Sequence, residues 1–102
     1  MDEREEQFRK LAEEFPESPL GHFSLGKHYL DTDRATLAVA ALERAVDRDP
    51  SYAAAWVALG DAFGLINAAD KARAAYTRAL ETPLGRKDQS LQADVADRIA
   101  GL

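Results

Sequence analysis

The side chains best suited to metal binding or acid–base chemistry are two histidines and two short aspartate pairs. His22 and His28 lie six residues apart, and on one helix this spacing points them to different sides. A zinc site needs three or four ligands drawn from cysteine, histidine and carboxylate side chains, and the chain has no cysteine. We therefore expect His22 to be a core ring with one satisfied nitrogen, His28 to lie at the surface or between helices, and neither to bind a metal.

The aspartate pairs, Asp31 with Asp33 and Asp47 with Asp49, resemble fragments of a calcium-binding loop. A true loop also needs a longer alternating series of ligands, a turn glycine and a distal glutamate, so we expect turns and helix ends instead. The sequence has no glycine-rich phosphate loop, Gly-x-Ser-x-Gly elbow or histidine–nucleophile set. We expect no catalytic residue, no cofactor and no enzymatic activity.

Length and charge limit what the chain can bind. Its 102 residues give room for one domain, and its net charge of −5 is concentrated in residues 1–17, which carry seven acidic and three basic side chains. No basic stripe is present, so nucleic acid and anionic membranes are poor candidates as partners. The chain also lacks a signal-peptide pattern and any apolar run near the ~20 residues of a spanning helix, and we expect a cytoplasmic protein.

The chain repeats itself at an offset of 34 residues. Matched positions hold identical or similar side chains, namely His22 and Trp56, Leu25 and Leu59, Gly26 and Gly60, Tyr29 and Phe63, Ala38 and Ala72, Leu42 and Tyr76, Arg44 and Arg78, and Ala45 and Ala79. A 34-residue period of two helices each is the signature of the tetratricopeptide repeat, and the chain resembles that family over most of its length. It departs from the family pattern at His22, where tryptophan is typical, and at Asp94, where the frame requires glycine.

The resemblance implies an all-α fold, a right-handed α-solenoid of about six antiparallel helices in three pairs. We expect a single domain over residues 1–102, divided into an amino-terminal half-repeat helix (1–17), a first repeat (19–52), a second repeat (53–86) and a carboxyl-terminal capping helix (87–102). In this frame Phe8 and Leu11 match Leu42 and Ala45. The first helix therefore resembles the second helix of a repeat whose first helix is missing.

Local signals place the helix ends. Ser18 and Pro19 predict a capped helix start, Ser51 is expected to cap the fourth helix, and Asp33 and Asn67 are expected at left-handed turns. The fifth helix is expected to stop at residues 83–85, which we interpret as a linker. In the last helix Leu91, Val95, Ile99 and Leu102 share one face, and we expect Asp94, Asp97 and Arg98 to point outward.

Gly26 and Gly60 lie inside predicted helices, where glycine costs about 1 kcal/mol relative to alanine. We expect close helix packing to offset that cost, with a bulky side chain of the partner helix filling the space over each glycine. Replacing Gly85, in the expected linker, by alanine should cost far less than Gly60→Leu, unless Gly85 has a positive φ.

In the family that the chain resembles, first helices line a concave groove that holds peptides. Helical spacing places seven side chains on that face, Leu20, Phe23, Lys27, Leu30, Val57, Asp61 and Leu65, although neighbouring helices could cover them. A lysine–asparagine clamp for carboxyl-terminal peptides is not expected, because the matching positions hold Phe23, Lys27 and Ala58. We predict a non-catalytic protein–protein interaction module with a protein or peptide partner. The alternative is a structural scaffold that self-associates into a homo-oligomer.

Overall fold

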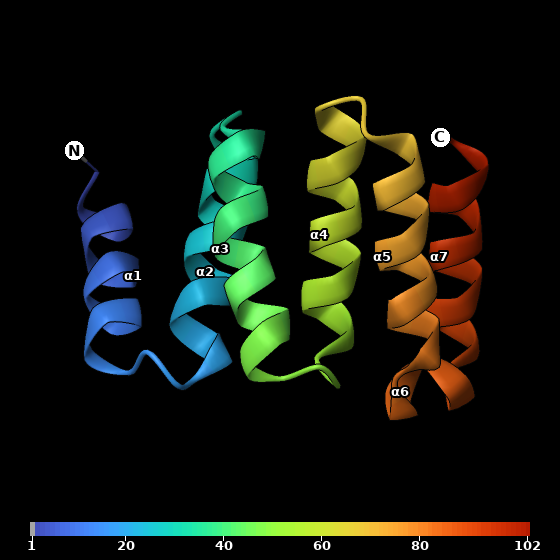
Figure 1. The fold of residues 1–102 in the computed structure, drawn as a ribbon, viewed down its shortest axis with the longest axis horizontal. Helices are drawn as coiled ribbons and strands as arrows, with labels where there is room; N and C mark the ends of the chain where they lie inside the picture. Colours follow the sequence, from blue (N-terminus) through green and yellow to red (C-terminus); the bar gives the residue numbers. More distant parts are fainter. Residues whose placement is uncertain (1) are drawn as a thin grey trace.

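The computed structural model describes residues 2–102, which form seven helices and no strand. They are α1 (Glu3–Glu14), α2 (Pro19–Asp31), α3 (Ala35–Arg48), α4 (Ala53–Leu65), α5 (Ala69–Glu81), the short α6 (Pro83–Lys87) and α7 (Gln89–Ala100). The helices stand side by side in chain order, with the two termini at opposite ends of the row (Figure 1). This arrangement confirms the predicted all-α solenoid of antiparallel pairs. No helix within residues 2–102 has the length and apolar character needed to span a bilayer.

Several helix ends follow from local side chains. Ser18 caps α2 by accepting a hydrogen bond from the Leu20 N–H, and Pro19 is the first helical residue, as predicted. Asp33 and Asn67 have φ angles of 58° and 62°, so both turns are left-handed as expected. The prediction for Ser51 is wrong, because α4 starts after Tyr52 without a side-chain cap. The Ser51 N–H donates instead to Asp49 Oδ1 at 3.0 Å.

The two helix pairs pack through the predicted glycines. A Cβ atom built on Gly26 would lie 2.5 Å from Leu42 Cγ, and one on Gly60 would lie 2.5 Å from Tyr76 Cδ1. Leu42 is fully buried and Tyr76 nearly so. Each glycine thus lets α2 or α4 approach its partner helix, and the large side chain opposite fills the space.

The expectation of a linker at residues 83–85 is wrong, because these residues belong to the short helix α6. Thr82 accepts a hydrogen bond from the Gly85 N–H, and Pro83 occupies the first position of α6. Gly85 is buried, and a Cβ there would meet the carbonyl oxygen of Ala79 and lie 2.7 Å from the Leu80 Cα. Residues 2–102 therefore contain the short α6 in addition to the six helices expected, and Gly85 is a close-packing residue with backbone against it.

The last helix, α7, packs against the end of the solenoid through its predicted apolar face. Val95 is fully buried, and Leu91 and Ile99 are half-buried against the core. The expectation that Arg98 points outward is wrong, because its guanidinium reaches back to Asp61 on α4. Beyond residue 83 the 34-residue frame is lost, and spacing within one helix could not identify this long-range partner.

Candidate binding face

The seven residues predicted on the concave face differ in exposure. Leu20 and Leu65 are 57% and 65% exposed, Lys27 is exposed, and Phe23 and Leu30 are half-buried. Phe23 packs against Tyr52, with ring centroids 4.9 Å apart. Val57 is buried, and the half-buried Asp61 is engaged by other side chains. The accessible part of this face is therefore richer in α2 side chains than in α4 side chains.

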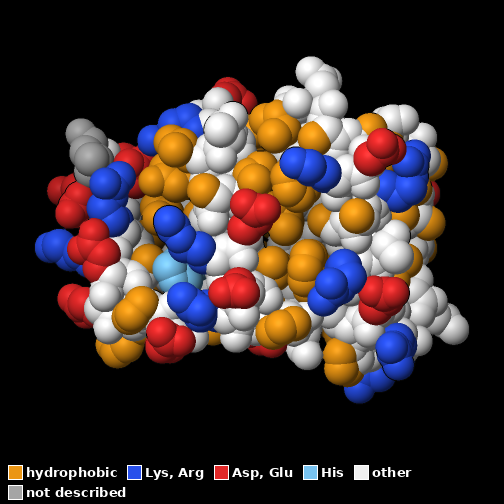
Figure 2. Space-filling view, viewed as in Figure 1, with side chains coloured by type: hydrophobic (Ala, Val, Ile, Leu, Met, Phe, Trp, Pro, Cys, Tyr) orange, Lys and Arg blue, Asp and Glu red, His pale blue; other side chains and the backbone are white. Residues whose placement is uncertain are grey.

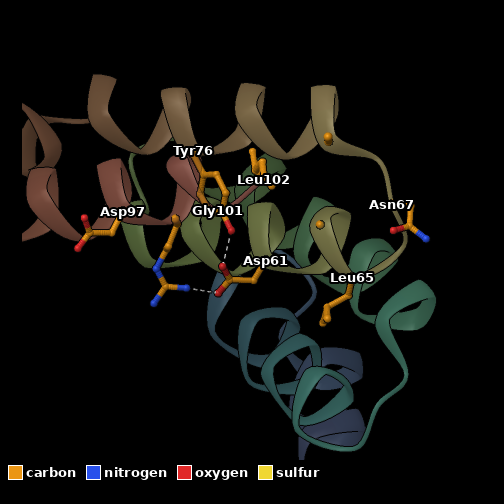
Figure 3. A pocket seen from close by; sticks show the side chains of 10 residues that line it. Asp61, Leu65, Asn67, Tyr76, Asp97, Gly101 and Leu102 are labelled. Carbon is orange, nitrogen blue, oxygen red and sulfur yellow. Dashed lines mark hydrogen bonds and ion pairs between the residues drawn. The ribbon is translucent and has the colours of Figure 1, made fainter.

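Asp61 holds the carboxyl-terminal end of the solenoid together. Tyr76 donates its hydroxyl to Asp61 Oδ1 and Arg98 donates to Asp61 Oδ2, each at 2.5 Å, so α4, α5 and α7 meet at one carboxylate (Figure 3). Burial and the hydrogen bond to Asp61 raise the pKa of Tyr76, so this hydroxyl stays protonated. Hydrogen bonds to Asp61 and, on its own helix, to Asp94 raise the pKa of Arg98. The geometry is that of a structural network whose groups already have partners.

A cavity of about 620 Å³ lies beside this network. Its lining includes Leu65 and Leu102, with Asn67 at the turn between α4 and α5 (Figure 3). It is open to solvent, and its charged lining residues are Asp61, Asp97 and Arg98. Asp61 and Arg98 pair with each other, so the cavity offers a ligand apolar surface beside the carboxylate of Asp97.

A second, smaller groove lies between α1 and α2 and was not predicted. It has a volume of about 210 Å³ and is lined by Arg4, Phe8, Phe23, Ser24, Lys27, His28 and Asp31. Two of the seven predicted residues, Phe23 and Lys27, therefore belong to a groove completed by α1. The signal in the sequence was the apolar stripe of Phe8 and Leu11 on a helix otherwise dominated by charge.

A buried polar cluster fixes α1 against α2 and the start of α3. Glu5 is 5% exposed and accepts hydrogen bonds from Arg34 at 2.5 Å and from Arg9 at 3.0 Å. The Arg34 hydrogen bond, reinforced by Arg9, holds the pKa of Glu5 below its usual value despite burial. His28 Nε2 lies 3.5 Å from Glu5 Oε1 and 3.4 Å from Asp2 Oδ2. Because this cluster holds α1 in place, α1 forms a fixed side of the groove.

The positions of the two histidines follow the sequence interpretation. His22 is buried, with Nε2 3.1 Å from the Pro16 carbonyl oxygen, and His28 is buried between α1 and α2. No cluster of three or more histidine, cysteine, aspartate or glutamate side chains in residues 2–102 is arranged to hold a metal ion.

Large apolar side chains remain exposed near the α1–α2 end. Leu11, Phe15 and Leu20 are 37%, 56% and 57% exposed. In the view of Figure 2, hydrophobic side chains gather over the middle of the molecule, whereas charged side chains of both signs crowd the α1 end. Leu11 therefore lies on a helix whose other exposed side chains are mostly charged.

The helix pairs, the glycine contacts and the open face together define an α-solenoid of the kind built from helical-hairpin repeats. The tetratricopeptide repeat family matches residues 5–52 and 23–90. The TPR repeat-containing protein PA0015 of Pseudomonas aeruginosa is 32% identical over 90 residues, which cover 88% of this chain and 86% of that protein. This chain belongs to the tetratricopeptide repeat family, whose members generally act in protein–protein interaction.

Other similarities extend to longer proteins and to solved structures. The anaphase-promoting complex subunit CDC16 of Saccharomyces cerevisiae is 36% identical over 70 residues, which cover 69% of this chain but only 8% of that subunit. Protein BPP2914 of Bordetella parapertussis has a TM-score of 0.80 at 26% identity, covering 99% of this chain and 88% of that one. The first TPR of Spaghetti (RPAP3), solved with the HSP90 peptide SRMEEVD, has a TM-score of 0.81 at 18% identity, covering 95% and 75%. At that identity the last likeness concerns the fold alone.

Proposed function

We propose that this protein is a non-catalytic binding module that holds a peptide or a segment of a partner protein on the face formed by its first helices. The observation that carries the proposal is the exposure of Leu20, Lys27 and Leu65 beside the half-buried Phe23 and Leu30. Aliphatic and aromatic anchors match the composition of interface centres, and an exposed lysine beside them matches the polar rim. The structure of Spaghetti with its HSP90 peptide supports this use of the fold in general.

In this proposal, five of the seven predicted residues would touch a partner directly. Val57 is buried, and Asp61 bridges Tyr76 and Arg98. We assign these two a supporting role beneath the face. A cytoplasmic location is part of the same proposal, as is the absence of nucleic acid and membrane among the partners.

The test is a capture experiment with matched variants. Wild-type protein, Phe23→Asp and Leu37→Asp would be used as baits in lysate of the source organism. Leu37 lies on α3 and is 49% exposed, so it controls for a new surface charge outside the proposed face. We expect a protein retained by wild type and Leu37→Asp but lost with Phe23→Asp, whose binding should weaken by more than about 2 kcal/mol. Equal retention by all three baits would refute the proposed face.

Self-association is the second candidate, and the exposed Leu11, Phe15 and Leu65 favour it. Sedimentation at several protein concentrations separates the two candidates. A molar mass that rises with concentration supports a homo-oligomer, and a constant monomer mass supports binding to a different partner.

A further inference from the structure

A groove lies in the middle of the row of helices, between the second helices α3 and α5. Both helices pack against α4, and the space between them has a volume of about 340 Å³. Its floor is apolar, because Val46 and Leu59 are buried and Trp56 is half-buried. The indole N–H of Trp56 donates to the Pro50 carbonyl oxygen at 2.8 Å. This hydrogen bond fixes the ring, and we call the space the Trp56 groove.

Two carboxylates of α3 border the Trp56 groove. Glu43 and Asp47 are exposed and lie four residues apart, on one face of the helix. Glu43 takes part in none of the ion pairs formed within residues 2–102. Asp47 lies 3.2 Å from Nη1 of Arg48, whose Nε is also 3.9 Å from Glu17. The α3 side of the groove is therefore acidic, and Glu43 is its uncompensated charge.

The cation among the lining residues, Arg78, lies on the opposite side, on α5. Its guanidinium carbon is 4.6 Å from the centroid of the Trp56 ring, and its Nε is 3.7 Å from a carboxylate oxygen of Glu81 on the same helix. Arg44 and Arg86 line neighbouring cavities instead. With the ion-paired neighbours included, the carboxylates of the groove outnumber its cations: Glu17, Glu43, Asp47 and Glu81 against Arg48 and Arg78.

The first repeat has an equivalent groove with a different charge. It lies between α1 and α3 and has a volume of about 310 Å³. The residues 34 positions before Glu43 and Asp47 are Arg9 and Glu13, and Arg44 takes the place of Arg78. A cation that enters this groove meets two arginines and one glutamate. The two grooves therefore differ in charge at matched positions, and each provides a control for the other.

We propose that the Trp56 groove binds a lysine or arginine side chain on an extended segment of a partner protein. Long basic side chains lay their methylene stem along apolar surface and keep the charged group at a polar edge. The stem would lie on Trp56 and Val46, and the charged group would reach Glu43 and Asp47, on the side away from Arg78. A groove of this volume takes a side chain rather than a helix, which is about 10–12 Å across.

This site lies outside the proposed binding face. It uses Trp56 and Leu59 of α4, whereas Phe23, Leu30 and Leu65 belong to the proposed face. A basic segment in the Trp56 groove leaves those three side chains free. One molecule would then hold two segments at once, and either site can fail a test without the other.

Two short peptides provide the probe and its control. They are acetyl-GAKAG-amide and the neutral acetyl-GAQAG-amide, titrated to tens of millimolar into ¹⁵N-labelled full-length protein. Trp56 is the only tryptophan of the chain, so its indole N–H resonance reports on the groove directly. We expect the lysine peptide to shift this resonance and the amides of residues 43–47 saturably. The glutamine peptide should bind about three- to fivefold more weakly, the factor expected for loss of exposed ion pairs.

Two matched protein variants complete the test. Glu43→Gln should weaken binding of the lysine peptide by about three- to fivefold. Glu13→Gln removes the same charge from an equally exposed position in the equivalent groove and should leave binding unchanged. Circular dichroism verifies that both variants fold.

Four results would overturn the inference. They are equal binding of the two peptides, an equal effect of the two variants, an unshifted indole N–H, and an indole shift that depends on protein concentration without any peptide, because a second copy would then occupy the groove. Shifts confined to Phe23, Leu30 and Leu65 would also overturn it, while supporting the proposed face.

Discussion

Replacing Gly60 by alanine tests the helix contact on which the second repeat depends. The added Cβ would lie 2.5 Å from Tyr76 Cδ1 and 2.8 Å from Tyr76 Cζ, whereas carbon atoms in contact keep about 3.5–4.0 Å. The ring must therefore move by about 1 Å to restore contact distance. Tyr76 is 3% exposed and its hydroxyl is held by Asp61, so the ring cannot move without disturbing its neighbours.

Three contributions determine how far Gly60→Ala changes the free energy of unfolding. Overpacking in a close-packed core costs about 1–3 kcal/mol, and loss of the Tyr76–Asp61 hydrogen bond costs about 1 kcal/mol more. Alanine has a better helix propensity than glycine, which stabilises the variant by about 1 kcal/mol. We expect Gly60→Ala to lower the free energy of unfolding by about 1–3 kcal/mol, and Gly60→Leu to lower it by more than about 2 kcal/mol.

Gly64 provides a matched control on the same helix. A Cβ there would have only Leu102 Cδ2 nearby, at an ordinary 3.6 Å, so Gly64→Ala should stabilise the protein by up to about 1 kcal/mol. Urea unfolding followed by far-ultraviolet circular dichroism measures both variants. If Gly60→Ala unfolds at the same urea concentration as Gly64→Ala, or at a higher one, the contact between Gly60 and Tyr76 does not have the role assigned to it.

Three further predictions concern other parts of the fold. Gly85→Ala should cost more than about 2 kcal/mol in the same urea assay, because the new methyl group meets the backbone of Ala79 and Leu80; a wild-type midpoint would contradict the packing. Burial raises the pKa of Tyr76 in the folded state, so stability should be full below pH ~10, where the unfolded tyrosine is neutral, and should fall as pH rises further. Tyr76→Phe should flatten that alkaline decline, and an unchanged slope between pH 8 and 11 would count against it. The pKa of Glu5 is lowered by Arg34, so its contribution is full above pH ~4.3 and is lost as pH falls through the folded pKa. Glu5→Gln should therefore speed hydrogen exchange of the α1 amides at neutral pH, and equal exchange at pH 7 would contradict this role.

Most of the fold could be predicted because residues 34 positions apart make equivalent packing contacts in the two repeats. Gly26 with Leu42 and Gly60 with Tyr76 are contacts between helices that follow each other in the chain. The error at residues 83–87 arose from interpreting Pro83 only as a stop. Proline at the first position also starts helices, and Thr82 supplies the cap that makes α6 possible.

The candidate site could be predicted only in part, because helical spacing gives the side of a helix and not what covers it. Phe23 and Val57 occupy equivalent positions, yet Val57 is buried and Phe23 is half-buried. Arg98 could not be linked to Asp61, 37 residues away, since the repeat frame ends before α7. The groove beside α1 was missed because the acidic side chains of that helix favoured a purely solvated cap.

The two ends of the solenoid differ in how their charged side chains are paired and which apolar side chains they expose. This difference bears on where a partner binds. At the carboxyl-terminal end, Val95 is fully buried and Arg98 joins Asp61 and Tyr76, so the charged groups of this network are already paired. At the α1 end the paired charges lie beneath the surface at Glu5, while Phe8 and Lys27 border an open groove. Ordering a partner segment costs conformational entropy, which contact with the half-buried Phe8 and the exposed Lys27 can offset at the α1 end. Because these features favour the α1–α2 end, a substitution there should disturb recognition more than an equally exposed substitution beside α7.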